Sequence, residues 1–193
     1  MISLALVVAA YVVGSIPFGV LVARAKGVDL RKVGSGNIGA TNVARALGRR
    51  WAVAVLVADA AKGWAPVWLG RRLGLPDAHV AIAGLFAIVG HMFTVFLRGR
   101  GGKGVATSLG VALAISPLAA LAGLALYVAA YSLTRLSSVG SLLGIWSFPL
   151  FAHFVGGGVA RPYTVLSLGA AALVTLRHRA NIKRLIRGEE KRA

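Results

Sequence analysis

The sequence predicts an all-α integral membrane protein, a bundle of seven transmembrane helices of which some are short. Of its 193 residues, 58% are hydrophobic and only 14% are charged, whereas soluble domains are about 45–50% apolar and about 25% charged. The apolar residues form long runs and lack an amphipathic rhythm, which is typical of membrane spans. The distribution of Lys and Arg then predicts an outer N-terminus and a cytoplasmic C-terminus.

The expected spans form a single polytopic domain over residues 1–193, with a basic cytoplasmic tail at 179–193. The first run lacks a basic n-region and exceeds the usual h-region, so we interpret it as a retained span and not as a signal peptide. The run over 105–133 is too long for one upright helix, and the sequence Ser116-Pro117 offers a break. The spans are 2–23, 51–70, 78–97, 104–117, 118–134, 136–155 and 162–178.

Charge supports a chain reversal at Ser116-Pro117. With the reversal, loops 24–50 and 98–103, position 135 and the tail share one side, which holds 18 Lys and Arg against 3 on the other side. A single helix over 105–133 would give 11 and 10. The positive-inside rule favours the first arrangement. The tail has basic residues near helical spacing, and we expect a short helix on the anionic leaflet.

Composition also excludes several kinds of chemistry. The chain has no cysteine, which excludes disulfides, zinc thiolate sites and cysteine nucleophiles. Five acidic residues and four unclustered histidines do not suggest a metal site, so we expect no metal and no cofactor. The net charge of +17 is explained by topology and by anionic lipids or substrates, and predicts no nucleic-acid partner.

The most informative motif is Gly-Ser-Gly-Asn-Ile-Gly-Ala-Thr-Asn at residues 34–42, just after the first span. Its glycines can bring backbone N–H groups close to an anion. It matches the G-x-G-x-x-G pattern, but no βαβ unit surrounds it, so a dinucleotide site is not predicted. Candidate phosphate ligands are therefore Gly34, Gly36 and Gly39. A flexible linker would not need the polar residues that accompany them, which are Ser35, Asn37, Thr41, Asn42 and Arg45.

A second glycine-rich loop precedes the fourth span at residues 98–107. Lys103 is followed by Gly104 and not by Ser or Thr, so this is not a Walker A motif. A lysine in a glycine-rich turn at a helix N-terminus still makes a good anion site. The alternative is a basic loop that only sets topology. The glycines favour a phosphate site, whose further candidates are Gly101, Gly102 and Thr107.

Three ionisable residues lie inside predicted spans. Asp59 and Lys62 share a helix face at i, i+3, where they can pair with each other. His91 lies near the cytoplasmic end of the third span. Such residues are candidates for function in a membrane, but a purely structural role for all three is equally consistent with the sequence.

Two further clusters are expected on the same side of the membrane. Ser137, Ser138 and Ser141 begin the sixth span, where they can cap the helix or bind phosphate. His178 and Asn181 share a face at the start of the tail, which is consistent with a role in the site.

Together these motifs resemble the bacterial acyl-phosphate-dependent glycerol-3-phosphate acyltransferases, the PlsY family. Ile38 and Thr94 stand where many members carry proline, and we expect this to change loop stiffness more than chemistry. The matching segments span the chain in the family's order. They are Gly34-Ser-Gly-Asn-Ile-Gly-Ala-Thr-Asn-Val43, Asp59-x-x-Lys62-Gly63, Gly90-His91-x-Phe93, Gly101-Gly-Lys-Gly-Val-Ala-Thr107 and Arg177-His178-x-x-Asn181-Ile-x-Arg184-Leu.

The resemblance implies transfer of a fatty acyl group from acyl phosphate to the 1-position of glycerol 3-phosphate, an early step of phospholipid synthesis. It implies a multi-pass protein of the bacterial inner membrane with a cytoplasmic active site, in contact with membrane lipids. The sequence leaves open whether a soluble enzyme that produces acyl phosphate docks on the basic face, which would be a sensible way to deliver an unstable donor. Acyl phosphate is already activated, so no covalent intermediate is needed. We expect the residues nearest the chemistry to be Ser35, Asn37, Lys103, His178 and Asn181.

The proton of the glycerol hydroxyl could go to His178, His91, Asp59 or the donor's own phosphate, and the sequence leaves this open. The alternative function is a transporter of a phosphate-bearing anion. Transporter sites usually lie at the bilayer midplane between repeats, whereas these motifs gather at one face and no repeat is evident.

Overall fold

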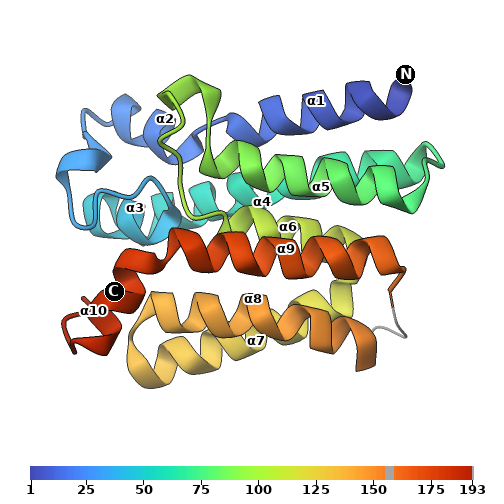
Figure 1. The fold of residues 1–193 in the computed structure, drawn as a ribbon. Helices are drawn as coiled ribbons and strands as arrows, with labels where there is room; N and C mark the ends of the chain where they lie inside the picture. Colours follow the sequence, from blue (N-terminus) through green and yellow to red (C-terminus); the bar gives the residue numbers. More distant parts are fainter. Residues whose placement is uncertain (155–158, 193) are drawn as a thin grey trace.

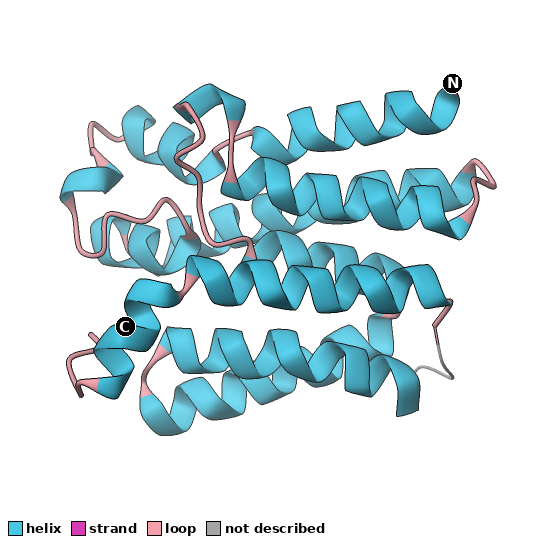
Figure 2. Cartoon of the chain, viewed as in Figure 1, coloured by secondary structure: helices cyan, strands magenta, loops and turns pink. Residues whose placement is uncertain are grey.

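A computed structural model describes residues 1–154 and 159–192, which form helices and loops without a β-strand (Figures 1 and 2). The long helices lie alongside one another, with the N-terminus at one end of the bundle and the short helices α2, α3 and α10 at the other (Figure 1). In chain order the helices are α1 (Ile2–Ser15), α2 (Phe18–Ala25), the 3₁₀ turn η1 (Leu30–Lys32), α3 (Ala40–Leu47), α4 (Arg49–Arg72), α5 (Asp77–Met92), the 3₁₀ turn η2 (Val95–Leu97), α6 (Val105–Ile115), α7 (Pro117–Thr134), α8 (Ser137–Phe154), α9 (Arg161–Arg177) and α10 (Arg179–Ile186).

Four helical stretches of the described chain are long and apolar enough to cross a membrane, and α6 is a shorter apolar helix. The four stretches are Ile2–Ala25, Arg49–Arg72, Asp77–Leu97 and Pro117–Thr134. The predicted break between the fourth and fifth spans is present. Ser116 has an extended backbone (φ −144°, ψ 91°) and Pro117 begins α7, because a proline disfavours helical geometry in the residue before it.

The first predicted span, 2–23, is not one continuous helix. It is interrupted between Ser15 and Phe18, because Pro17 offers no backbone N–H and restricts Ile16. The sequence analysis missed this break. Inside a membrane the carbonyl groups that it frees need partners within the protein. The Thr94 hydroxyl donates to the Ser15 carbonyl (2.5 Å), and Lys62 Nζ donates to the Ile16 carbonyl (2.7 Å).

Glycines allow the helices to approach one another closely. A Cβ atom on Gly14 would overlap the Ala87 backbone where α1 meets α5, and a Cβ atom on Gly110 would overlap the Ala60 carbonyl oxygen where α6 meets α4. Small residues at such contacts are common in membrane helix packing. The main buried cluster joins α4, α5, α6, α8 and α9, and includes Val67, Ile88, Met92, Val111, Phe148, Leu166 and Val174.

The contact between α4 and α6 gives a testable consequence. We expect Gly110→Ala to lower the unfolding temperature, with a loss of about 1–3 kcal/mol, because the added methyl group has to displace the Ala60 backbone. The control is Gly169→Ala in α9, where a Cβ atom would meet no atom within 4 Å. That variant should be unchanged or more stable by about 0.5–1 kcal/mol. Thermal unfolding of both proteins in one detergent measures the difference, and equal unfolding temperatures would contradict this account.

Candidate active site

A cavity of about 770 Å³ lies where the two glycine-rich loops meet the start of α8 and the junction of α9 and α10. This is within the usual range for small-molecule sites. The five residues expected nearest the chemistry all line it, and they are Ser35, Asn37, Lys103, His178 and Asn181. Its other part is apolar and is lined by Leu109, Ala112, Ala120, Leu124, Ile145 and Phe148.

Most of the remaining predicted site residues also line this cavity. They are Gly34, Gly39, Thr41, Asn42, Arg45, Asp59, His91, Gly104, Ser137, Ser138 and Ser141. The predicted residues outside the described lining are Gly36, Lys62, Gly101, Gly102 and Thr107. Thr107 is fully buried and packs against Gly63 of α4, so the structure gives it a packing position and no place at the cavity wall.

Asn42 determines the shape of the first glycine loop. Its Nδ2 donates to the Leu30 and Val33 carbonyl groups (both 3.0 Å), and its Oδ1 accepts from the Ser35 N–H (3.0 Å). Gly34 has φ +57°, which glycine adopts readily. The buried Asn42 amide is therefore engaged by the loop itself. We conclude that Asn42 holds the loop in place. Asn42 also lines the cavity, and its role in phosphate binding stays a prediction.

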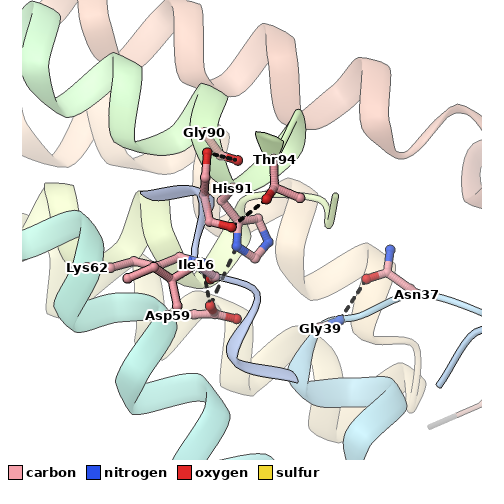
Figure 3. A network of polar contacts seen from close by, with 9 residues as sticks. Ile16, Asn37, Gly39, Asp59, Lys62, Gly90, His91 and Thr94 are labelled. Carbon is pink, nitrogen blue, oxygen red and sulfur yellow. Dashed lines mark hydrogen bonds and ion pairs between the residues drawn. The ribbon is translucent and has the colours of Figure 1, made fainter. Parts of the chain in front are cut away.

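Asn37 and Ser35 occupy the turn that leads into α3. The Asn37 Oδ1 accepts from the N–H of Gly39, two residues further along the chain, at 2.9 Å (Figure 3). The Asn37 N–H in turn donates to the Ser35 hydroxyl at 3.4 Å. The loop is thus an ordered turn beside a helix start, as an anion site requires.

The second glycine loop is fixed by groups on α5 and α9. The Gly102 N–H donates to the His91 carbonyl (3.0 Å), and Arg177 donates to the Gly101 carbonyl (2.8 Å) and the Gly102 carbonyl (3.0 Å). A Cβ atom on Gly102 would overlap the His91 ring. These glycines therefore seat the loop so that Lys103 reaches the cavity. The sequence analysis missed the part played by Arg177.

Lys103 has an unusual electrostatic environment. Its pKa is lowered to about 8, chiefly because the side chain is buried. Glu190 acts in the opposite direction, and the nearby Arg184 and Arg45 add smaller effects that lower the pKa. Lys103 is mostly protonated at neutral pH and lies among other cations, so an anion in the cavity would be strongly favoured.

The tail forms α10, as predicted, but the residues after it fold back over the cavity. The Glu190 carboxylate accepts from Ser138 Oγ (2.9 Å), Asn181 Nδ2 (2.5 Å) and Arg184 Nε (2.7 Å). Burial alone would raise the pKa of Glu190, but these hydrogen bonds outweigh it and hold the pKa below its usual value. The sequence analysis missed Glu190. The available signal was an acidic pair in a tail that is otherwise strongly basic.

His178 is buried, and its Nδ1 lies 2.8 Å from the Val174 carbonyl oxygen. Because a carbonyl oxygen can only accept, we assign the proton to Nδ1, which leaves Nε2 as an acceptor. Also in the lining, Ser137 Oγ lies 3.1 Å from both Thr41 Oγ1 and the Tyr127 hydroxyl. These contacts join the first loop to α7 and α8.

The ionisable residues of the spans form one network (Figure 3). Lys62 Nζ lies 2.7 Å from Asp59 Oδ1, and His91 Nδ1 lies 3.6 Å from the same oxygen. Lys62 Nζ also donates to the Ile16 carbonyl at the break between α1 and α2. Among the described residues, no group of three or more His, Asp or Glu side chains could hold a metal ion.

The hydrogen bonds of Glu190 predict that Glu190 stabilises the protein and that its neighbour Glu189 does not. Glu190→Ala leaves Asn181 and Arg184 without their acceptor, and we expect a loss of about 1–3 kcal/mol and faster proteolysis of the tail. Glu189→Ala is the matched control, because Glu189 is exposed and its side chain should contribute little. Thermal unfolding and limited proteolysis compare the two variants. Equal behaviour would show that the Glu190 contacts do not hold the tail.

Comparison with known proteins places this chain in a family. Residues 4–188 match the family model described as Glycerol-3-phosphate acyltransferase. Proteins of that name from Anaeromyxobacter sp. (strain Fw109-5) and Geobacter sulfurreducens are 53% and 50% identical to this chain. The matches cover 99% and 98% of this chain and 96% of each relative.

The fold has solved counterparts as well. Two crystal structures of PlsY (YgiH), an integral membrane glycerol 3-phosphate acyltransferase, represent its glycerol 3-phosphate form and its lysophosphatidic acid form. They are 41% and 39% identical to this chain, with TM-scores of 0.95 and 0.93, and the matches cover all of this chain and 96% and 95% of theirs. The chain belongs to the glycerol-3-phosphate acyltransferase family.

Proposed function

We propose that this chain moves a fatty acyl group from acyl phosphate to the 1-position of glycerol 3-phosphate, releasing lysophosphatidic acid and inorganic phosphate. The observation that carries the proposal is the two-part character of the cavity, in which a wall of cations, amides and hydroxyls continues into an apolar part. Both reactants carry phosphate, and one of them carries a long acyl chain. The glycerol 3-phosphate and lysophosphatidic acid forms of the PlsY crystal structures support the acceptor and the product.

The polar wall suits two phosphate-bearing reactants, whose like charges have to be neutralised. Lys103 and Arg45 supply cations, and the loop around Ser35 supplies backbone N–H groups and hydroxyls. Charge-assisted hydrogen bonds of this kind are stronger than neutral ones, and donors placed before the reaction stabilise charge that develops during it. Ser137, Ser138 and Ser141 extend this wall along α8.

In the reaction, the glycerol hydroxyl oxygen attacks the acyl carbonyl carbon, and the bond from that carbon to the phosphate oxygen breaks. The proton of the hydroxyl passes either to His178, whose Nε2 is an acceptor, or to the departing phosphate. Asp59 is already paired with Lys62, which makes it a weaker candidate. Because the donor is activated, positioning and electrostatics supply most of the rate enhancement, and Asn37 and Asn181 serve as positioning groups.

The membrane arrangement follows from charge. We propose one domain with seven spans, including α6, α8 and α9, with the N-terminus outside and the site at the cytoplasmic face of the bacterial inner membrane. The two glycine loops and the helices α2, α3 and α10 gather at the end of the bundle that carries most of the Lys and Arg (Figure 1). That basic face could also receive a soluble enzyme that delivers acyl phosphate.

Purified protein tests the reaction directly. With palmitoyl phosphate and glycerol 3-phosphate together, we expect release of inorganic phosphate and an equal amount of lysophosphatidic acid, measured by mass spectrometry. Phosphate release without the acceptor would indicate a hydrolase. Absence of release across several lipids and detergents would favour transport of a phosphate-bearing anion.

The pKa of Lys103 predicts a pH dependence. Lys103 carries its charge below pH about 8 and loses it above, so kcat/KM for glycerol 3-phosphate should fall as pH rises through 8. The acceptor's phosphate, with a second pKa of about 6, does not titrate there. Lys103→Arg should remove this fall, because a guanidinium does not titrate in this range.

Lys103→Ala should lower kcat/KM at pH 7 by about 10²–10³. Lys183→Ala, at an exposed lysine of α10, is the control and should keep the normal rate. A pH profile of Lys103→Arg that falls in the same way as the unsubstituted protein would assign the titration to another group.

A further inference from the structure

A groove of about 430 Å³ lies between α8 and α9, apart from the candidate active site. Its lining is mainly apolar, with Trp146, Pro149, Leu150 and His153 from α8 and Thr164 and Leu168 from α9. The α8–α9 groove shares no described lining residue with the cavity that holds Lys103. None of its residues belongs to a motif of the sequence analysis, and the proposed reaction does not use them.

The helix α8 separates the groove from the active-site cavity. Trp146, Leu150 and His153 follow one another at i, i+4 and i+7, a spacing that marks one face of a helix, and they line the groove. Ile145 and Phe148 belong to another face and line the active-site cavity. A ligand in the groove would therefore not contact the reacting groups.

The groove is open to the surroundings of the bundle. Leu150, Leu168 and Trp146 keep 60%, 46% and 45% of their surface exposed. Pro149 lies inside α8, and a proline within a helix disturbs its regular packing. In a membrane, the surroundings of such side chains are lipid acyl chains.

A hydrogen bond joins the two helices at the end of the groove nearer the glycine loops. Trp146 Nε1 donates to Thr175 Oγ1 at 3.0 Å. From Thr164 to Thr175, α9 rises by about 17 Å at about 1.5 Å per residue. One leaflet of a bilayer has a hydrocarbon thickness of about 15 Å, so the length of this stretch suits one acyl chain of a lipid.

A cation lies at the other end of the groove. Arg161 begins α9 at the end of the bundle where the N-terminus lies (Figure 1), and it shares a helix face with Thr164 at i, i+3. Arg161 is exposed and forms no ion pair within the described part of the chain. Asp77, the acidic residue at this end, instead accepts a hydrogen bond from the Tyr163 hydroxyl at 2.7 Å. The charge of Arg161 is thus available to an anion.

We propose that the α8–α9 groove binds an anionic phospholipid, with one acyl chain between the helices and the headgroup phosphate at Arg161. The lipid belongs to the leaflet away from the glycine loops. Apolar surface binds the chain, and an arginine near the membrane surface attracts an anionic headgroup. The proposal does not depend on the proposed function, because no residue of the groove lines the candidate active site.

Photolabelling of the purified protein in lipid nanodiscs tests the site. The probe is a small share of phosphatidylglycerol that carries a diazirine in one acyl chain, and mass spectrometry of peptides locates the label after illumination. We expect the groove to be labelled about fivefold more than Leu121 and Val128 of α7, which are similarly exposed but line neither the groove nor the active-site cavity. Phosphatidylcholine with the same diazirine chain should label the groove about fivefold less than phosphatidylglycerol.

Two variants separate the headgroup from the chain. Arg161→Gln should lower labelling of the groove by phosphatidylglycerol about fivefold, to the level of phosphatidylcholine. Leu168→Trp fills the groove and should lower labelling by both lipids. The matched control is Leu176→Trp, at an exposed residue of the same helix outside the lining, which should label as the unsubstituted protein does.

Three results would overturn the proposal. Equal labelling of the groove and of α7 by phosphatidylglycerol would show only the lipids that surround any membrane protein. Equal labelling of the groove by the two lipids would remove the role of the anionic headgroup. Both measurements use the unsubstituted protein, so they stand even if Leu168→Trp fails to fold. Unchanged labelling in a folded Leu168→Trp protein would show that the chain does not lie in the groove.

Discussion

Inside a bilayer, every backbone polar group has to find its partner within the protein, and this requirement organises the centre of the molecule. Pro17 interrupts the first span and frees the carbonyl groups of Ser15 and Ile16, which Thr94 and Lys62 then satisfy. Lys62 is a cation buried among helices, so it requires Asp59 beside it. The single break between α1 and α2 thus accounts for a charged pair that is unusual inside a membrane.

Hydrogen bonds within the protein also fix the two glycine loops and the tail. In these segments the bonds come from side chains, because the segments lack regular secondary structure. Asn42 closes the first loop, Arg177 holds the second, and Glu190 fastens the tail over α8. Each uses several hydrogen bonds to fix a segment that has no regular ladder of its own. Reactive groups held by such supports need little reorganisation during the reaction, which is the main requirement for electrostatic catalysis.

Much of this arrangement could be predicted from the sequence, and the reasons are physical. Long apolar runs predict the helices, and the break at Pro117 follows from proline geometry. Glycines beside Ser35 and Lys103 predict the two loops that line the cavity. The roles of Asn42, Arg177 and Glu190 could not be predicted, because each contacts groups brought close only by folding. Pro17 itself indicates a helix break, but it lies inside a long apolar run, and that run favoured one continuous span over 2–23. Thr94 illustrates the remaining difficulty, since its hydroxyl donates to the carbonyl of Ser15, which lies far from it in the sequence.

The attachment of Glu190 to Ser138 and Asn181 has a consequence for biosynthesis. The wall that these residues form contains Glu190, which the ribosome adds after every described helix that lines the cavity. A nascent chain can therefore insert most of its helices into the membrane while the catalytic centre is still unfinished. The cavity wall would then be complete only after Glu190 has left the ribosome and accepted its hydrogen bonds from Ser138 and Asn181.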